Sequence, residues 1–353
     1  MKTSKLRYIT TLVAWNCTLF VTLCCVVIAG VEAYLRISIP RSTGTPVWER
    51  TAEDDRYKLM KRNFVSYPYG IEFRTNELGF RDNKSAVPAK SEHDTRIIVL
   101  GDSFTAAAGV PFDALFTSLV EAKLREHHSG IQVLNLAVGG YEPVRYRKVF
   151  ERMRSVLDPD VVVAAIYPEN DFSNHTYEYD RLRALGLDEP EQSRCYESLY
   201  VYRAYLWRVV ARAERIVKAD RERQKIAEGD RQHGPTPDWD ENADAIKAIS
   251  RIARESGLEF VVVLLPETAR NLEDRALESR YFRVVQLCHE ENIPCLNLLS
   301  RFAAAGVEGN KLRLNAIDAH PNAKYHALVA EYLSPFLEGV LAGNRDSFIM
   351  NEE

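Results

Sequence analysis

The stretch "RIIVLGDSFTAAAGV", residues 96 to 110, decides the fold of this chain. Its first five residues form an apolar run with the length and composition of a buried strand, and Gly101 ends that run. Asp102 and Ser103 follow side by side before the sequence becomes helical again. In an open parallel α/β sheet, the loop that leaves a strand faces the crevice where ligands bind, so this order predicts a functional serine. The alternative is that Ser103 only caps a helix.

Four more apolar runs predict the rest of the sheet. Helical candidates separate them, which predicts a parallel sheet that is covered on both faces. The five strands are expected at residues 96–100, 131–136, 160–167, 258–266 and 293–298.

One long segment interrupts this alternation of strands and helices. Its first half contains "YESLYVYRAYLW", residues 196–207, and its second half is heavily charged. We expect a helical insertion at about 175–240 that covers the sheet or helps to form the mouth of a site. A charge run is usually a solvated face, and a membrane-surface or partner role for the aromatic half is the alternative.

The N-terminus carries an apolar run of 24 residues without a charge, "YITTLVAWNCTLFVTLCCVVIAGV", residues 8–31. At about 1.5 Å per residue this run is long enough to cross roughly 30 Å of hydrocarbon. Three basic residues precede it and Glu32 follows it, which favours a cytoplasmic N-terminus and an extracytoplasmic remainder. A cleaved secretory signal ending at Ala33 and a buried helix of a soluble domain are the alternatives.

Composition limits the other classes of function. The 353 residues are 46% apolar and 27% charged, which suits one large α/β domain with appendages. A formal net charge of -4 gives no basic field for nucleic acid, so we expect no nucleic-acid partner. Outside the apolar run only Cys195, Cys288 and Cys295 remain, without zinc-site spacing; Cys288 and Cys295 are expected to be buried, with a disulfide between them as the alternative.

The expected organisation has three parts. Residues 1–35 form the cytoplasmic N-terminus and the membrane anchor, and residues 36–95 form an extended lead-in that lies on the domain. Residues 96–345 form the α/β domain, which includes the insertion. We expect no metal and no cofactor.

Three more loops at the predicted strand ends contain residues that could take part in catalysis. A glycine pair that ends at Gly140 follows the second run, Asn170 follows the third, and Asp318 and His320 precede the final helix. Because parallel strands end at the same edge of a sheet, we expect these residues to gather around Ser103.

These blocks resemble those of the SGNH, or GDSL, hydrolase superfamily. "GDSF", "NLAVGG", "END" and "DAHPN" occur in the family's order, and the resemblance covers about residues 96–341. "NELGFRD", residues 76–82, resembles the lead-in of membrane-anchored bacterial members. The resemblance implies a flavodoxin-like three-layer α/β/α sandwich with a mainly parallel five-stranded sheet, and a serine mechanism that cleaves esters.

The resemblance also implies a role for each residue. Ser103 is the nucleophile, His320 its general base and then acid, and Asp318 orients the imidazole. The Ser103 N–H, the Gly140 N–H and the Asn170 side-chain amide are the oxyanion donors. These residue types suit the chemistry, because a serine hydroxyl needs a neighbouring base and the tetrahedral oxyanion needs fixed N–H donors.

The last block departs from the family's commonest pattern, since one residue rather than two separates Asp318 from His320. Asp102 and Asp171 are expected to hold loops by accepting backbone hydrogen bonds, and either is the alternative acid for orienting the imidazole. His326 is expected to pack or to cap.

The expected function is therefore that of an anchored, extracytoplasmic SGNH-type esterase in the cell membrane, periplasmic in a Gram-negative host. It removes O-acyl groups, in the first place acetyl, from a cell-envelope or extracellular carbohydrate. The sugar follows from the location and from the family's substrates, and from no residue here. Acyl transfer to a sugar hydroxyl and a noncatalytic glycan-binding or assembly role are the alternatives.

Overall fold

The computed structural model of the chain describes residues 2–38, 48–50, 58–172, 237–268, 272, 275–315 and 318–344. The predicted insertion at about 175–240 lies outside these residues except for its last four positions, which begin helix α8. Cys195 also lies outside them.

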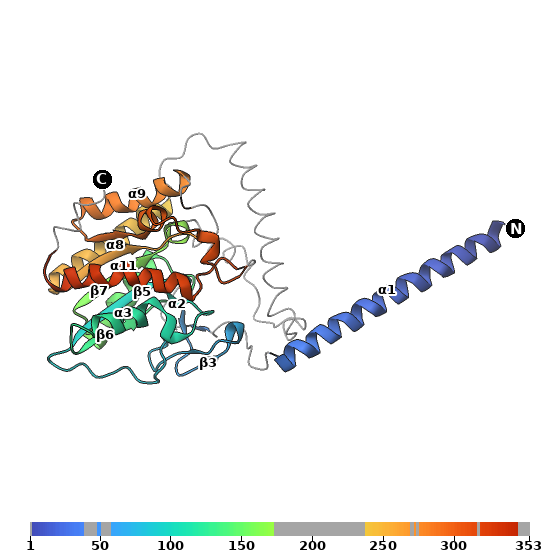
Figure 1. Ribbon diagram of the computed structural model, residues 1–353, viewed down its shortest axis with the longest axis horizontal. Helices are drawn as coiled ribbons and strands as arrows, with labels where there is room; N and C mark the ends of the chain where they lie inside the picture. Colours follow the sequence, from blue (N-terminus) through green and yellow to red (C-terminus); the bar gives the residue numbers. More distant parts are fainter. Residues whose placement is uncertain are drawn as a thin grey trace.

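Five parallel strands form the central sheet, as the sequence predicts (Figure 1). The order across the sheet is β6-β5-β7-β8-β9, so the strand of this sheet that comes first along the chain, β5, lies second across it, as in flavodoxin-like folds. The strands are β5 (Thr95–Gly101), β6 (Ile131–Asn135), β7 (Val161–Ile166), β8 (Glu259–Leu264) and β9 (Cys295–Asn297). Because all five run in the same direction, their carboxyl ends meet at one edge.

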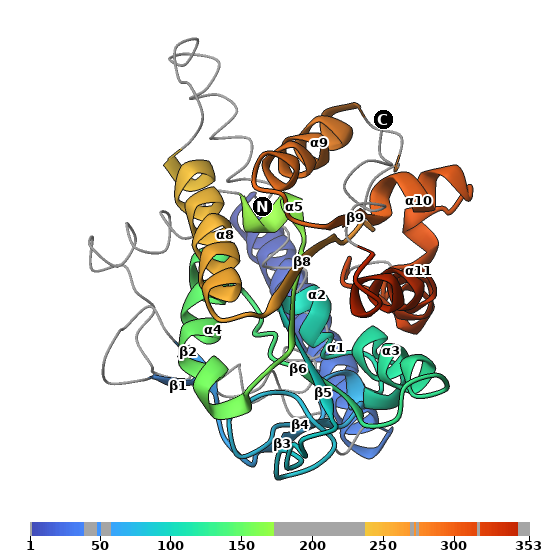
Figure 2. The same cartoon turned by 90° about the vertical axis from the view of Figure 1, so that its left-hand side faces the viewer.

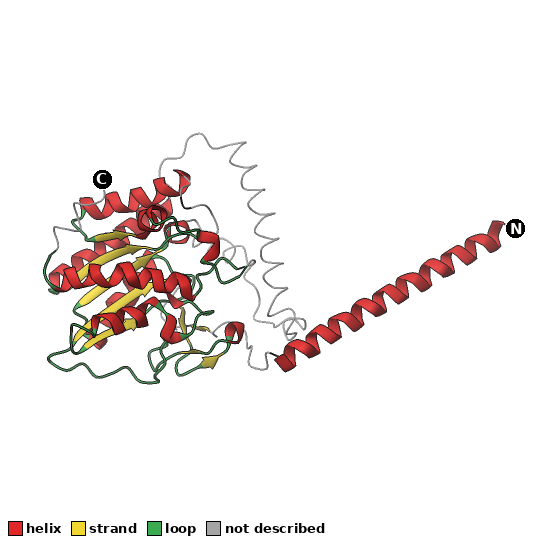
Figure 3. Ribbon diagram, viewed as in Figure 1, coloured by secondary structure: helices red, strands yellow, loops and turns green. Residues whose placement is uncertain are grey.

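The strands read as continuous apolar runs because helices cover both faces of the sheet. All six residues of β7, "VVVAAI", are buried, and six of the seven residues of β5 are buried. A strand with one face in water would instead alternate apolar and polar residues. Figure 3 shows the yellow strands enclosed by red helices.

Helices form the two outer layers. Helices α3 and α11 pack together on one face, and α4 and α8 pack together on the other (Figure 2). The helices of the domain are α2 (Ser103–Ala106), α3 (Phe116–Leu124), α4 (Pro143–Leu157), α5 (Pro168–Asp171), α8 (Pro237–Glu255), α9 (Arg275–Glu290), α10 (Leu298–Ala304) and α11 (Ala323–Leu341). The predicted three-layer sandwich is confirmed.

The lead-in contains two short antiparallel strand pairs. Strand β1 (Trp48–Arg50) pairs with β2 (Lys58–Met60), and β3 (Val65–Ser66) pairs with β4 (Phe73–Arg74). Met60, Phe73 and Phe80 are almost fully buried and belong to the same hydrophobic cluster as the sheet. The lead-in therefore shares the core of the α/β domain.

The N-terminal apolar run forms a single helix, α1 (Lys2–Ser38). Its window Thr11–Tyr34 has a mean hydropathy of 2.3, and none of it is buried against the rest of the chain. By length and composition this helix is compatible with a membrane anchor or a signal sequence.

Candidate active site

Ser103 is the first residue of α2, two positions after the end of β5. The capping side chain of this short helix belongs to Asp102, whose carboxylate accepts the Phe104 N–H at 2.8 Å. The Ser103 hydroxyl therefore does not serve as the cap, and its side chain is half-buried at the edge of the sheet where the strands end.

The turn between β5 and α2 requires Gly101. A Cβ atom at this position would lie 2.4 Å from Oγ1 and 2.7 Å from Cβ of Thr105. Thr105 is fully buried, and its carbonyl accepts a hydrogen bond from Asn135 Nδ2 at 3.0 Å. Because the Thr105 Cβ cannot turn away from its own backbone, a side chain at position 101 would push α2 away from the strand end.

Arg81 of the lead-in holds the far end of α2. Its guanidinium is buried and donates to the carbonyls of Ala106, at 2.7 Å, and of Ala107 and Val110. Burial lowers the pKa of Arg81 to about 9, so the group stays positively charged at neutral pH. A cation on the last carbonyls of a helix is favourable. The sequence indicated this motif through "NELGFRD" but gave no role to its arginine.

Ser103, His320 and Asp318 form a continuous row. The Ser103 Oγ lies 3.0 Å from His320 Nε2, and His320 Nδ1 lies 2.6 Å from Asp318 Oδ1. The His320 side chain is 46% exposed, whereas that of Asp318 is 9% exposed. The serine end of the row is thus open to a substrate while the acid end is enclosed.

The environment of Asp318 favours its ionised form. Burial raises the pKa of this carboxyl, but the hydrogen bond and the charge of His320, together with the hydrogen bond from Tyr69, outweigh burial and hold the pKa well below its usual range. The backbone N–H of His320 also donates to Oδ1, at 3.0 Å. Asp318 is therefore a stable anion beside the imidazole.

Aromatic rings and hydrogen bonds support the loop that carries His320. The Phe104 ring stacks on Tyr167 with centroids 4.0 Å apart and lies 5.9 Å from the His320 ring. The Thr268 hydroxyl donates to the Ala319 carbonyl. These contacts tie the histidine loop to the ends of the neighbouring strands.

Three N–H donors lie in the loops at this edge. No backbone carbonyl of the described residues accepts the N–H of Ser103 or of Gly140. Gly140 has φ +77°, where a residue with a side chain is strained, although a Cβ there would meet no atom within 4 Å. Asn170 Nδ2 donates to Asp102 Oδ2 at 3.0 Å. Asp102 thereby fixes the rotation of the Asn170 amide.

The two alternative acids make their described hydrogen bonds elsewhere. Asp171 accepts the Tyr167 N–H at 2.9 Å and the Tyr146 hydroxyl at 3.0 Å, and both Asp102 and Asp171 are fully buried. Burial raises the pKa of Asp102 to about 6 and raises that of Asp171 well above its usual value. Both acids hold loops by accepting backbone hydrogen bonds, as predicted from the sequence.

His326 is part of the packing. Its Nδ1 accepts the Phe116 N–H at 3.2 Å, and its ring stacks on the Phe116 ring. Burial lowers the pKa of His326 to about 3, so the imidazole is neutral.

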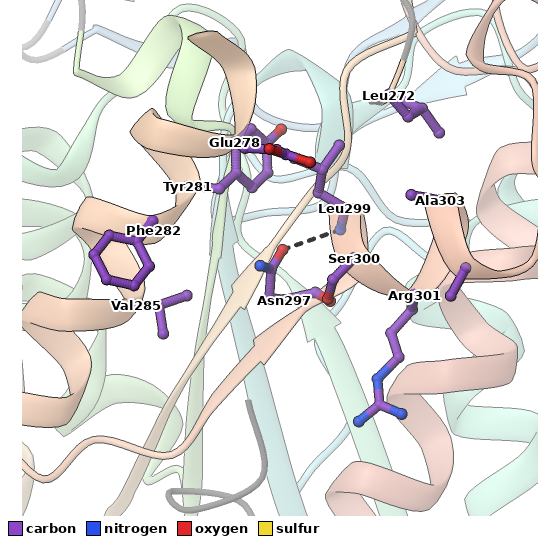
Figure 4. Close-up of a pocket in the computed structure, with 11 residues that line it drawn as sticks. Leu272, Glu278, Tyr281, Phe282, Val285, Asn297, Leu299, Ser300, Arg301 and Ala303 are labelled. Atoms are coloured by element: carbon purple, nitrogen blue, oxygen red, sulfur yellow. Dashed lines mark hydrogen bonds between the residues drawn. The ribbon is translucent and has the colours of Figure 1, made fainter. Parts of the chain in front are cut away.

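A separate hollow of about 450 Å³ lies between α9 and α10 at the edge strand β9 (Figure 4). Ser103 and His320 are not among its lining residues. The Asn297 side chain in this hollow accepts the Leu299 N–H at 3.1 Å, and the Tyr281 hydroxyl donates to the Leu265 carbonyl. Because these polar groups serve the fold, we assign no ligand to the hollow.

Within the described parts of the chain, no group of three or more His, Cys, Asp or Glu side chains is arranged to hold a metal ion. Cys288 is buried and Cys295 is half-buried, and no disulfide joins them.

No protein-family model and no curated relative matches this sequence. Solved structures similar to it include TesA, at 15% identity over 69% of this chain and 98% of that chain, with a TM-score of 0.43. The esterase EstA from Pseudoalteromonas sp. matches at 14% identity over 70% of this chain and 100% of that chain, with a TM-score of 0.42. A variant of Axe2, an acetylxylan esterase from Geobacillus stearothermophilus, matches at 14% identity over 69% and 94% of the two chains, with a TM-score of 0.42. At these values the matches by themselves establish neither the family nor the function.

The buried charge of Asp102 predicts a pH-dependent cost to stability. Its pKa is about 6 in the folded chain, whereas a solvated aspartate has a pKa of about 3.9, and one pKa unit corresponds to about 1.4 kcal/mol. The folded state thus resists ionisation, so stability falls as the pH rises from about 4 to about 6, by about 3 kcal/mol in total. Asp102→Asn should therefore raise the free energy of unfolding at pH 7, and the gain should shrink toward pH 4.

Denaturant unfolding of the full chain in detergent, at pH 7 and at pH 4, measures this effect. Asp244→Asn is the matched control, because that side chain is 77% exposed. A lower stability of Asp102→Asn at pH 7 would mean that hydrogen bonds to the carboxylate outweigh the cost of burying it.

Proposed function

We propose that this chain is a serine esterase of the SGNH type. The observation that carries the proposal is the row from Ser103 Oγ through His320 to Asp318, with contacts of 3.0 and 2.6 Å, at the sheet edge where ligands bind in open α/β folds. A serine within hydrogen-bond reach of a histidine that is oriented by a third group is the arrangement of an activated nucleophile.

The proposed reaction proceeds in two halves. Ser103 Oγ attacks the ester carbonyl while His320 Nε2 takes the hydroxyl proton, and His320 then returns this proton to the departing alcohol. The acyl group is left on Ser103. Water next gives a proton to His320 and attacks the acyl-serine, and His320 then returns this proton to Ser103 Oγ as the carboxylic acid leaves.

The N–H groups of Ser103 and Gly140 and the Asn170 amide are the proposed oxyanion donors. Support comes from the two backbone N–H groups that no described backbone carbonyl accepts, and from Asp102, which holds Asn170. Fixed donors of this kind act on the charge that develops during attack, and the loss of one typically costs about 100- to 1000-fold in rate.

The proposed substrate is an O-acylated carbohydrate of the cell envelope or the extracellular space, with acetyl as the first candidate acyl group. Support comes from the family that the four sequence blocks resemble and from the anchor, which would hold the domain at a membrane surface. Release of acetate from an acetylated polysaccharide, against release of longer acyl chains, tests this choice.

Replacement of the nucleophile tests the mechanism. Ser103→Ala removes the only oxygen that is proposed to attack the substrate, so turnover of a short-chain chromogenic ester should fall by about 10,000-fold or more. Labelling by a fluorophosphonate probe should disappear as well. Ser300→Ala, an exposed serine on α10, is the control and should keep full activity. Near-normal turnover by Ser103→Ala would exclude this mechanism.

We also propose that α1 crosses the membrane with its N-terminus in the cytoplasm, so that the catalytic domain lies outside. The support is the charge pattern, since Lys2, Lys5 and Arg7 precede the apolar run and Glu32 is the first charge after it. The apolar window is 24 residues long, which suffices for a span.

Protease accessibility tests this topology. With the full chain expressed in a Gram-negative host, protease added to intact spheroplasts should digest the domain that follows α1 and spare a cytoplasmic marker protein. Protection of the domain until the spheroplasts are lysed would reverse the orientation. A mature chain that begins near Ala33 would instead identify a cleaved signal.

A further inference from the structure

The tip of the β3–β4 hairpin in the lead-in reaches the acid of the site. Tyr69 lies in the short 3-10 turn Pro68–Gly70, and its hydroxyl donates to Asp318 Oδ2. The two residues are 249 positions apart in the sequence. The lead-in therefore supplies a side chain to a row whose other members all come from the α/β domain.

Tyr69 is held in an unfavourable backbone conformation. Its φ of 58° lies in the left-handed region, which is uncommon for a bulky residue and costs about 1 kcal/mol or more. Such conformations persist where the surroundings determine them, and they cluster at functional sites. In this strained conformation the Tyr69 hydroxyl is directed at Asp318.

The hydrogen bonds of Asp318 show what the hydroxyl adds. Oδ1 accepts both the ring Nδ1–H and the backbone N–H of His320. Oδ2 accepts the Tyr69 hydroxyl, and the Asp318 side chain is only 9% exposed. Without the Tyr69 hydroxyl the carboxylate would lose a hydrogen-bond donor on Oδ2, the oxygen that does not face the imidazole.

We propose that Tyr69 is a positioning residue of this site: its hydroxyl holds Oδ2 of Asp318 so that Oδ1 stays directed at His320 Nδ1. The inference rests on the proposed function insofar as Asp318 orients the base of that reaction. It extends the site to the lead-in, because the β3–β4 hairpin then supplies a side chain that orients the acid of the site.

The hydroxyl also bears on where the proton resides. A donor on Oδ2 stabilises the carboxylate, so the proton that His320 takes from Ser103 stays on the imidazole and does not pass to Asp318. Among the described residues Asp102 also acts electrostatically on His320, and a change at Tyr69 leaves Asp102 in place.

A purely structural role for Tyr69 would be to fasten the hairpin to the domain. That role and the positioning role predict different effects of removing the Tyr69 hydroxyl. Fastening would alter the stability of the lead-in, and any variant that weakens the hairpin would reproduce its effect. Positioning would alter kcat, the pH profile and the hydrogen bond between Asp318 and His320, and only loss of this hydroxyl would do so.

Tyr69→Phe removes the hydroxyl and keeps the ring. With the detergent-solubilised full chain and a short-chain ester, kcat should fall by about 10-fold, the size expected for one hydrogen bond to a charged group, while KM stays within about 2-fold. The acid limb of the pH profile should also change, because the hydroxyl contacts the carboxylate beside the imidazole. Ser66→Ala is the matched control, since it removes a hydroxyl that donates to the Phe73 carbonyl within the same hairpin. It should keep both kcat and the profile.

Proton NMR of the same variants gives a measure that needs no turnover. The low-field resonance of the His320 Nδ1–H, identified by its loss in His320→Gln, should shift in Tyr69→Phe and stay in place in Ser66→Ala. A resonance and a kcat that are unchanged in Tyr69→Phe would overturn the proposal, as would equal losses of kcat in the two hairpin variants. A shifted resonance in a chain that hydrolyses no ester would uphold the positioning role and reject the proposed function.

Discussion

The parallel pairing of β5 with β6 on one side and β7 on the other determines where three residues of the site lie. This pairing brings the loops after the three strands to the same edge of the sheet, and those loops carry Ser103, Gly140 and Asn170. The pairing depends on complete burial, because β5 and β7 are apolar on both faces and are stable only with helices on each side. The position of the candidate site thus follows from the burial of two strands.

Three aspartates near this edge differ in pKa because the effect of burial and the effect of hydrogen-bond partners balance differently at each. Asp318 has a histidine and a tyrosine as partners and is held as an anion. Asp102 and Asp171 are fully buried beside neutral donors, and the pKa of each is raised. The same side chain therefore serves as a charged neighbour of the imidazole in one place and as a costly loop anchor in the other two. Burying Asp102 costs folding stability, and the same side chain orients the Asn170 amide, which we propose as an oxyanion donor.

Much of the fold could be predicted from the sequence, because buried parallel strands leave long apolar runs and the helices between them are regular. The last strand was predicted too long: β9 covers only Cys295–Asn297, since Asn297 already caps α10 and the run continues as helix. The residues that the four blocks suggested, Ser103, Gly140, Asn170 and the Asp318–His320 pair, are brought to one edge. Tyr69 and Arg81 were missed, because the lead-in has no periodicity and their partners are distant in the sequence. The "YPYG" turn signals a bend in the chain, and no local pattern tells which residue lies opposite it.

The most direct test of the account is to trap the acyl-enzyme. The full chain is mixed with a short-chain activated ester and quenched in acid within the first turnover, and its peptides are analysed by mass spectrometry. We expect the peptide that contains Ser103 to gain the mass of one acyl group, and we expect this modification to decay as product forms. The Ser103→Ala variant should not acquire it. Ester hydrolysis with the acyl group on another residue, or with no acylated residue during turnover, would contradict the central claim.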